Sequence, residues 1–201
     1  LKPEQLNQEF IYFIHIANGV VDAGSFRGAY GPRFVFTIER RFDEVAIVRQ
    51  NTAFYFDPEN AISGAAEANI ARAVLAVQPI LAEDEETGEL LIETDSLFLS
   101  ESFSQLTPTP NPDADPTTQF TLGGLDKDKS QIVALRSYPQ NTDIEVEYTF
   151  FNAAPLVSGS DAVTDSRHIA IRAMHSLIEM PKNDYQPRYA DARLGSFNQQ
   201  I

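Results

Sequence analysis

The chain has 201 residues and a formal net charge of −14. A chain this acidic is repelled by nucleic acid and by anionic membrane surfaces, so neither is expected as a partner. It contains no cysteine, which excludes disulfides and thiolate metal sites, and no apolar run approaches the roughly 20 residues of a membrane span. A hydrophobic content of 43% with 14 Phe and 7 Tyr favours a folded, β-rich chain.

The N-terminal quarter of the chain predicts three strands. The segment 8–16 (QEFIYFIHI) has apolar side chains on both faces, which is typical of a central strand. The segment 34–42 alternates apolar and polar residues and is followed by Asp43-Glu44 and an apolar return at 45–48, so a hairpin is expected there. Residues 18–32 hold four irregularly spaced glycines and predict a flexible connection.

The middle of the chain is more ambiguous. The alanines of 61–76 favour a helical turn, followed by a strand at 74–81 that carries a proline. Four adjacent acidic residues at 83–86 lack the spacing of a calcium-binding loop and predict a solvated hairpin tip. Asp95-Ser96 predicts the N-cap of a short helix, whose apolar contacts are Leu97, Phe98, Phe103 and Leu106. Residues 107–118, with four prolines, predict an exposed loop.

The C-terminal part predicts a strand pair at 131–135 and 143–151 and a further strand from residue 168. Together the elements predict a mainly β (α+β) fold, a largely antiparallel sheet or sandwich of about eight to ten strands with one or two short helices. We expect a single domain over residues 1–201, with two lobes divided near the 107–118 loop as the alternative.

The three histidines do not predict a metal site. His168 and His175 lie seven residues apart in one predicted strand and therefore on opposite faces, and His15 lies in the first strand. No HExxH motif and no histidine pair at i, i+4 is present. The chain also lacks a G-x-S-x-G elbow, so no residue is assigned a catalytic role.

The candidate binding residues follow the last predicted strand, in the segment DYQPRYADARLGSF. Arg188 and Arg193 flank Asp191, and their planar guanidinium groups suit carboxylate partners. With Tyr185 they predict a surface that binds a following domain or a peptide. The same residues equally fit an ion-paired strap that holds the C-terminal segment on the sheet.

Four stretches resemble one protein family: ERRFDEVAIVRQNTAF, AVLAVQPILAEDEETGELLIETDSLFLSE, LRSYPQNTDIEVEYTF and RHIAIRAMHSLIEMPKNDYQPRYADARLGSF. They resemble the N-terminal region of large, exported bacterial zinc-dependent metalloproteases, a region usually catalogued as a domain of unknown function. The resemblance spans most of the chain, and the closing xPRxxDxRxG motif is its most specific part.

The resemblance implies a parent enzyme with a signal peptide before this piece and a catalytic domain after it, exported to the periplasm or the cell exterior. Because the HExxH helix that binds zinc is expected in that catalytic domain, no cofactor is expected in this fragment. The expected partners are the catalytic domain of the same polypeptide and a peptide substrate. Three roles are open: a structural platform, a wall of the substrate cleft, or an inhibitory pro-region in which Asp191 or His175 reaches the zinc ion.

A different class of function competes with this one. The chain would then be an independent β-sandwich module that binds peptide or polysaccharide through exposed aromatic residues such as Tyr30, Tyr55 or Tyr138. A third class, a free-standing hydrolase, requires activity in the isolated chain.

Overall fold

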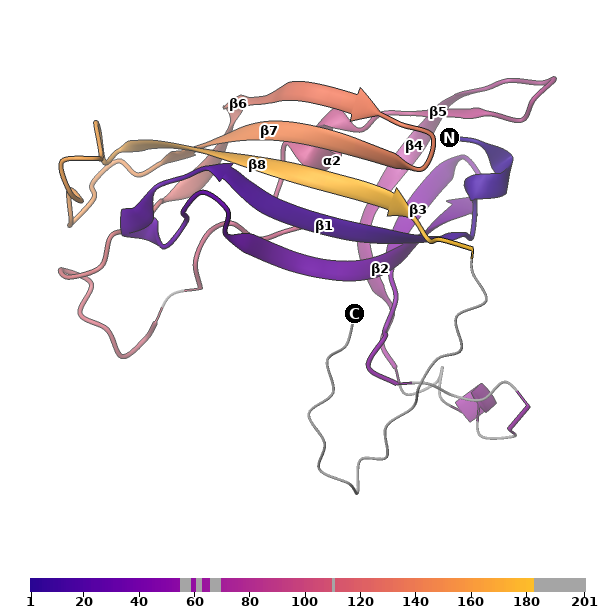
Figure 1. Cartoon of the computed structure of the whole chain (residues 1–201), viewed down its shortest axis with the longest axis horizontal. Coiled ribbons are helices and arrows are strands. Elements are labelled where there is room, and N and C mark those ends of the chain that lie inside the picture. Colours follow the sequence, from indigo (N-terminus) through magenta and orange to yellow (C-terminus); the bar gives the residue numbers. More distant parts are fainter. Residues whose placement is uncertain (55–58, 61–62, 66–69, 110, 183–201) are drawn as a thin grey trace.

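The computed structural model describes residues 1–54, 59–60, 63–65, 70–109 and 111–182. Within them, eight strands form one curled antiparallel sheet in the order β5-β4-β3-β2-β1-β8-β7-β6 (Figure 1). The strands are β1 (Glu9–Asn18), β2 (Tyr30–Arg41), β3 (Glu44–Arg49), β4 (Ala73–Glu83), β5 (Leu90–Ile92), β6 (Gly124–Ser137), β7 (Asn141–Phe151) and β8 (His168–Glu179). The short helices among these residues include η1 (Pro3–Gln5), η2 (Val21–Ala23) and α2 (Asp95–Phe98). The predicted mainly β, antiparallel fold is confirmed, as one curled sheet.

Strand β1 is the central strand that its sequence predicts. It pairs with β2 on one side and with β8 on the other. Its inner face carries Phe10, Tyr12, Ile14 and Ile16, all buried, whereas its outward side chains are half-buried. The inner apolar residues of β1 thus enter the core, and its outward apolar residues lie in a strand that is paired on both sides.

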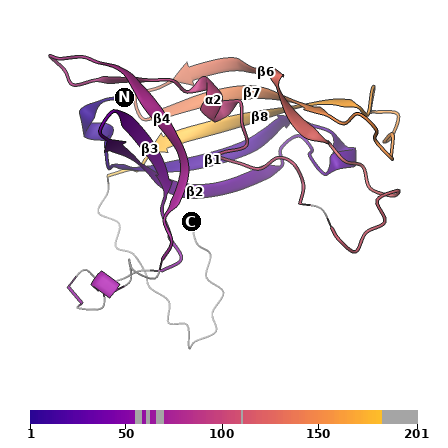
Figure 2. The ribbon, with the colours of Figure 1, turned by 180° about the vertical axis from the view of Figure 1, so that it is seen from behind.

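The inner face of the sheet is covered by the chain itself. Strands β3 and β4 curl behind β1 and β8 in Figure 1, and Figure 2 shows α2 lying over β7 and β8 on that side. Phe98 and Phe103 are buried there, and the Phe103 ring stacks on Tyr12 with 4.9 Å between centroids. Burial of each such aromatic ring stabilises the fold by roughly 1.5–3 kcal/mol. The apolar contacts predicted for the short helix are thus core contacts.

Both predicted hairpins form, but the first turn lies one residue earlier than expected, at Phe42 and Asp43, because Glu44 already pairs with Arg41 as the first residue of β3. Phe42 takes a left-handed conformation (φ 56°) between β2 and β3. The acidic segment 83–86 forms the turn before β5, where Asp84 Oδ1 accepts hydrogen bonds from the backbone N–H groups of Glu86 and Thr87. Hydrogen bonds from Thr87 and Glu86 lower the pKa of the Asp84 carboxyl group, so it stays ionised as a turn-forming acceptor.

Two local expectations differ from the structure. Residues 30–32, expected in a flexible connection, already belong to β2, where Tyr30 pairs with His15. Asp95 lies inside the helix that it was expected to cap, because the side chain of Glu93 accepts hydrogen bonds from the backbone N–H groups of Asp95 and Ser96. A carboxylate two residues before the first helical turn therefore does the capping. Whether residues 1–201 form one domain or two lobes stays a prediction.

Candidate functional site

The predicted binding residues Tyr185, Arg188, Asp191 and Arg193 lie outside the described residues. The structure does describe the strand that leads to them. Strand β8 runs between β1 and β7 and ends at Glu179, and its backbone hydrogen bonds continue to Met180, whose N–H donates to Glu9 O (3.1 Å). The chain therefore leaves the sheet beside the first residues of β1.

A buried polar cluster joins three neighbouring strands, β1, β8 and β7. His175, which is 1% exposed, lies between the side chains of Tyr12 and Tyr148. Its Nδ1 is 2.8 Å from Tyr12 Oη and its Nε2 is 2.8 Å from Tyr148 Oη. Tyr148 Oη also donates to the backbone carbonyl of Phe98, at 2.7 Å, and so ties α2 to the sheet.

The hydrogen bonds of this cluster fix its protons. Tyr148 has one hydroxyl proton, which it donates to Phe98 O, so it accepts from His175 Nε2–H. The lone pair of Nδ1 then accepts from Tyr12 Oη–H. Burial lowers the pKa of His175 to about 4 and raises the pKa of both tyrosines, so all three groups are neutral.

This cluster stabilises the core and has no access to a ligand. Both ring nitrogens of His175 are already bonded, and the two tyrosine side chains are also buried. For His175 to ligate an external ion, two buried hydrogen bonds would have to break. The sequence placed His175 on the apolar face of its strand but gave no signal for its partners, which lie 163 and 27 residues away along the chain.

The other two histidines lie elsewhere. His168 is exposed and its ring is 5.0 Å from that of Phe151, on the opposite face of β8 from His175, as predicted. His15 is half-buried on the outer face of β1, 6.0 Å from the ring of Phe13. Among the described residues, no three side chains of His, Cys, Asp or Glu gather where they could hold a metal ion.

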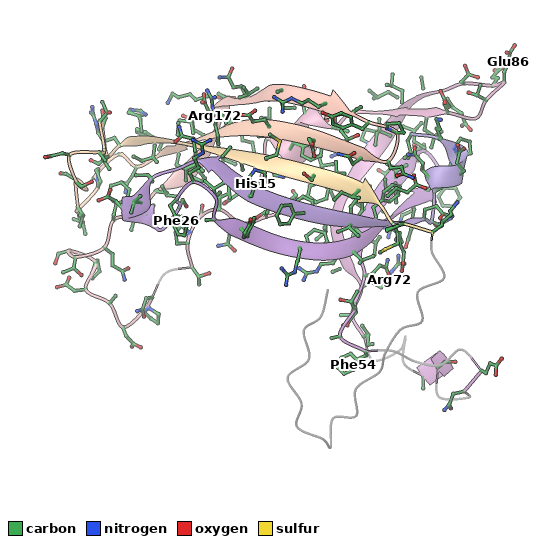
Figure 3. The ribbon with its side chains drawn as sticks, viewed as in Figure 1. His15, Phe26, Phe54, Arg72, Glu86 and Arg172 are labelled. Carbon is green, nitrogen blue, oxygen red and sulfur yellow. The ribbon has the colours of Figure 1, made fainter. Side chains whose placement is uncertain are left out.

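The outer face of the sheet, turned to the reader in Figure 1, carries a half-buried apolar band. Cross-strand pairing places its members side by side: Ile11 is opposite Val35 and Ile178, and His15 is opposite Met174. With Phe13 these residues form what we call the outer band: Ile11, Phe13, His15, Val35, Met174 and Ile178. No described helix or strand crosses this face in Figures 1 and 3.

Ionic pairs border the outer band on its β7 side. Arg172 Nε donates to Glu147 Oε2 at 2.8 Å, and its Nη1 is 3.9 Å from Glu145 Oε1. Ser176 Oγ donates to Asp143 Oδ1 at 2.7 Å. Figure 3 shows Arg172 and His15 on the same side of the ribbon. The band is therefore an apolar centre with a partly ion-paired rim, which is the anatomy of a protein-binding surface.

A pocket opens at the other face, where β2 begins. It has a volume of about 150 Å³ and lies between β1, the loop before β2, and the segment 104–106. Ser104 lines it and is 6% exposed, and within the described residues Ser104 Oγ is the one buried side-chain oxygen or nitrogen without a hydrogen-bond partner. Its lining residues are Ile14, Ile16, Gly24, Ser25, Ala29, Tyr30, Gly31, Ser104, Gln105 and Leu106.

The sequence indicated one of the residues that line this pocket. Tyr30, a candidate aromatic contact, is a lining residue and is 76% exposed, but its ring lies against that of Phe13 in the outer band, with 5.5 Å between the ring centroids. Gly31 is required beside Tyr30, because a Cβ there would lie 2.5 Å from Ile14 Cγ2. Nothing in the sequence singled out Ser104. Of the other candidate aromatics, Tyr138 is exposed in the β6–β7 turn and Tyr55 lies outside the described residues.

Comparison with known proteins identifies the family of this chain but assigns it no function. No helix in the described part of the chain is long and apolar enough to cross a membrane. No curated protein and no solved structure matched the chain. One family model matches residues 28–201, which is most of the chain, and its description is "Domain of unknown function (DUF5117)". The chain therefore belongs to the DUF5117 family.

Proposed function

We propose that this chain is a non-catalytic platform domain of an exported zinc-dependent metallopeptidase and that its outer band docks against the catalytic domain of the same polypeptide. The observation that carries the proposal is the outer band itself. Its six side chains are only half-buried and no described element lies over them. The resemblance of the DUF5117 region to the N-terminal part of such enzymes supports the choice of partner.

The position of β8 supports the same partner. Met174 and Ile178 belong both to the outer band and to the last described strand. Polypeptide that continues from β8 therefore starts at the edge of this surface, and a tethered partner has a high effective concentration there. The candidate residues Arg188, Asp191 and Arg193 lie in that continuation and are proposed as contacts to the same domain.

The test uses the parent protein expressed as two polypeptides, this chain and the remainder. A first requirement is an HExxH motif in the remainder. Phe13→Ser in this chain is then expected to weaken association by about tenfold or more, since a truncated aromatic at the centre of an interface typically costs at least that much. Leu156→Ser is the matched control, because Leu156 is 69% exposed in a loop outside the outer band.

Affinity is measured by isothermal titration, and the unfolding midpoint of each variant is measured alone. Unchanged affinity for the Phe13 variant contradicts the docking surface, as does an equal loss for both variants. Peptidase activity in the isolated chain contradicts the non-catalytic role. The alternative function, binding of a separate peptide or polysaccharide, is favoured by a different feature, the pocket at Ser104.

A further inference from the structure

The hairpin formed by β4 and β5 carries exposed apolar side chains. Val77, Pro79 and Leu81 are spaced two residues apart along β4 and therefore share a face. Ala82 pairs with Leu91, and the register shift there leaves Leu81 as the extra residue of a β-bulge beside that pair. Val77 is 42%, Leu81 59% and Leu91 60% exposed. We call Val77, Pro79, Leu81 and Leu91 the hairpin patch, and exposed apolar side chains gathered in this way mark an interaction site.

The backbone edge next to the hairpin patch is already occupied. Strand β5 is the last strand of the sheet on this side. Leu90 N donates to Leu1 O and Leu1 N donates to Leu90 O, both at 2.8 Å. The N-terminal residue thus pairs with the edge of β5 that faces away from β4. A partner is therefore recognised by the side chains of the hairpin patch and not by strand addition at Leu90.

Carboxylates border the hairpin patch on two turns. The β4–β5 turn is one of them, and Figure 3 shows Glu86 at its outermost end. The β2–β3 turn is the other, and it meets β4 where Ile80 N donates to Asp43 O at 2.8 Å. Among the described residues, none of the bordering carboxylates forms an ion pair with a cation. They belong to Asp43, Glu44, Asp84, Glu85, Glu86 and Glu89.

This border determines which kind of partner fits. Nucleic acid and anionic membrane surfaces carry the same sign of charge as the border and are repelled by it. A polypeptide segment with apolar side chains flanked by Lys or Arg is complementary to both features. Its apolar side chains can cover the exposed leucines, while its cations approach carboxylates that have no cation of their own.

We propose that the hairpin patch binds a polypeptide segment in which leucine-sized apolar side chains are flanked by Lys or Arg. The apolar side chains pack on Leu81 and Leu91, and the flanking cations pair with the carboxylates of the β4–β5 turn. Opposite charge speeds the encounter, and the apolar contact sets how long the complex lasts. The site is separate from the outer band, because β3 lies between β4 and β2, the nearest strand of that band.

The probes are three synthetic peptides of equal length, and their binding to the 201-residue chain is measured by fluorescence anisotropy. The first has a leucine-rich centre flanked by lysines, the second has glutamates in place of the lysines, and the third has serines in place of the leucines. The first is expected to bind at least tenfold more tightly than either of the others. No binding of the first peptide overturns the proposal, as does equal binding of the second or the third.

Substitution of the two leucines tests the apolar contact. Leu81→Ser combined with Leu91→Ser is expected to lower the affinity for the first peptide about tenfold or more, with an unchanged urea midpoint because both side chains are exposed. Leu135→Ser combined with Leu156→Ser is the matched control, since these leucines are 61% and 69% exposed and lie outside the hairpin patch. An equal loss of affinity in the control refutes the site.

Substitution of the turn carboxylates tests the charge contact without touching a strand. Glu85→Gln combined with Glu86→Gln is expected to lower the affinity about threefold at low salt and less at high salt. Asp128→Asn combined with Asp161→Asn removes the same charge from exposed positions elsewhere, and an equal effect there shows a general attraction to an acidic chain and refutes the site. Phe13→Ser should leave peptide affinity unchanged, so failure of this site and failure of the outer band are distinguishable; a loss of affinity with Phe13→Ser contradicts their separation.

Discussion

Removing the Tyr148 hydroxyl from the His175 cluster should lower the free energy of unfolding far more than removing the Tyr12 hydroxyl. Tyr148 Oη makes two hydrogen bonds, to His175 Nε2 and to Phe98 O, whereas Tyr12 Oη makes one, to His175 Nδ1. Tyr12→Phe and Tyr148→Phe delete the same atom from the same type of residue at similar burial. Because both variants lose the same volume, comparing them isolates the effect of the number of hydrogen bonds that are lost.

The magnitudes follow from the groups left behind. Tyr12→Phe leaves the acceptor Nδ1 unpaired, at a cost of about 1–3 kcal/mol. Tyr148→Phe leaves both the Nε2–H donor and the Phe98 carbonyl unpaired, at a cost of about 2–6 kcal/mol. A native domain with a free energy of unfolding of about 5–15 kcal/mol tolerates the first change and is severely weakened by the second. The double variant should cost less than the sum, because both hydroxyls bond the same imidazole.

The assay is equilibrium urea unfolding at neutral pH, followed by far-ultraviolet circular dichroism. With a slope of about 2 kcal/mol per molar urea, the two single variants should differ in midpoint by about 0.5–1.5 M. Equal losses for the two variants, or a larger loss for Tyr12→Phe, would refute the proton assignment. Strict additivity in the double variant would show that the hydroxyls do not share His175.

Three further predictions can be checked on the same material. The pKa of His175 is near 6.5 in the unfolded chain and about 4 in the folded chain, so the free energy of unfolding should fall by about 3 kcal/mol as the pH drops through that window. Urea unfolding measured at a series of pH values should show a smaller fall for His175→Gln than for the unchanged chain. Gly123→Ala should destabilise the fold more than Gly24→Ala, because both have positive φ but only the former Cβ overlaps a backbone carbonyl, and equal midpoints contradict this. Arg188→Ala combined with Arg193→Ala should weaken association with the remainder of the parent protein, measured by titration, and unchanged junction proteolysis and thermal unfolding count against it.

Most of the sheet could be predicted because its strands carry a period-two signal in local sequence. β7 alternates Ile144, Val146 and Tyr148 with acidic residues, and the acidic residues are on the face with Arg172. β1 lacks that alternation because its outward residues Ile11 and Phe13 are themselves apolar and belong to the outer band. Where burial is the main determinant, the pattern of apolar residues indicates the structure.

The contacts that give the sheet its specificity could not be predicted in this way. His175 meets Tyr148 only because β8 lies between β1 and β7, and strand order is a long-range property. Capping by Glu93 in place of Asp95 depends on one carboxylate reaching forward to the N–H groups of the first helical turn. The pocket at Ser104 requires three separate segments to meet, and no periodic signal connects them.

The proton arrangement at His175 also separates the roles open to this domain. An inhibitory pro-region needs a free lone pair that can reach a zinc ion, but Nδ1 accepts from Tyr12 and Nε2 carries the proton donated to Tyr148. Reaching the metal would expose a histidine that is 1% accessible and break the bond network that holds α2. The proposed platform role requires only that His175 stabilise the fold, and the surface proposed for docking is the outer band, whose side chains are half-buried. Of the two residues expected to reach a zinc ion, the bonds of His175 therefore argue against that one, whereas the proposed docking rests on side chains of the described sheet.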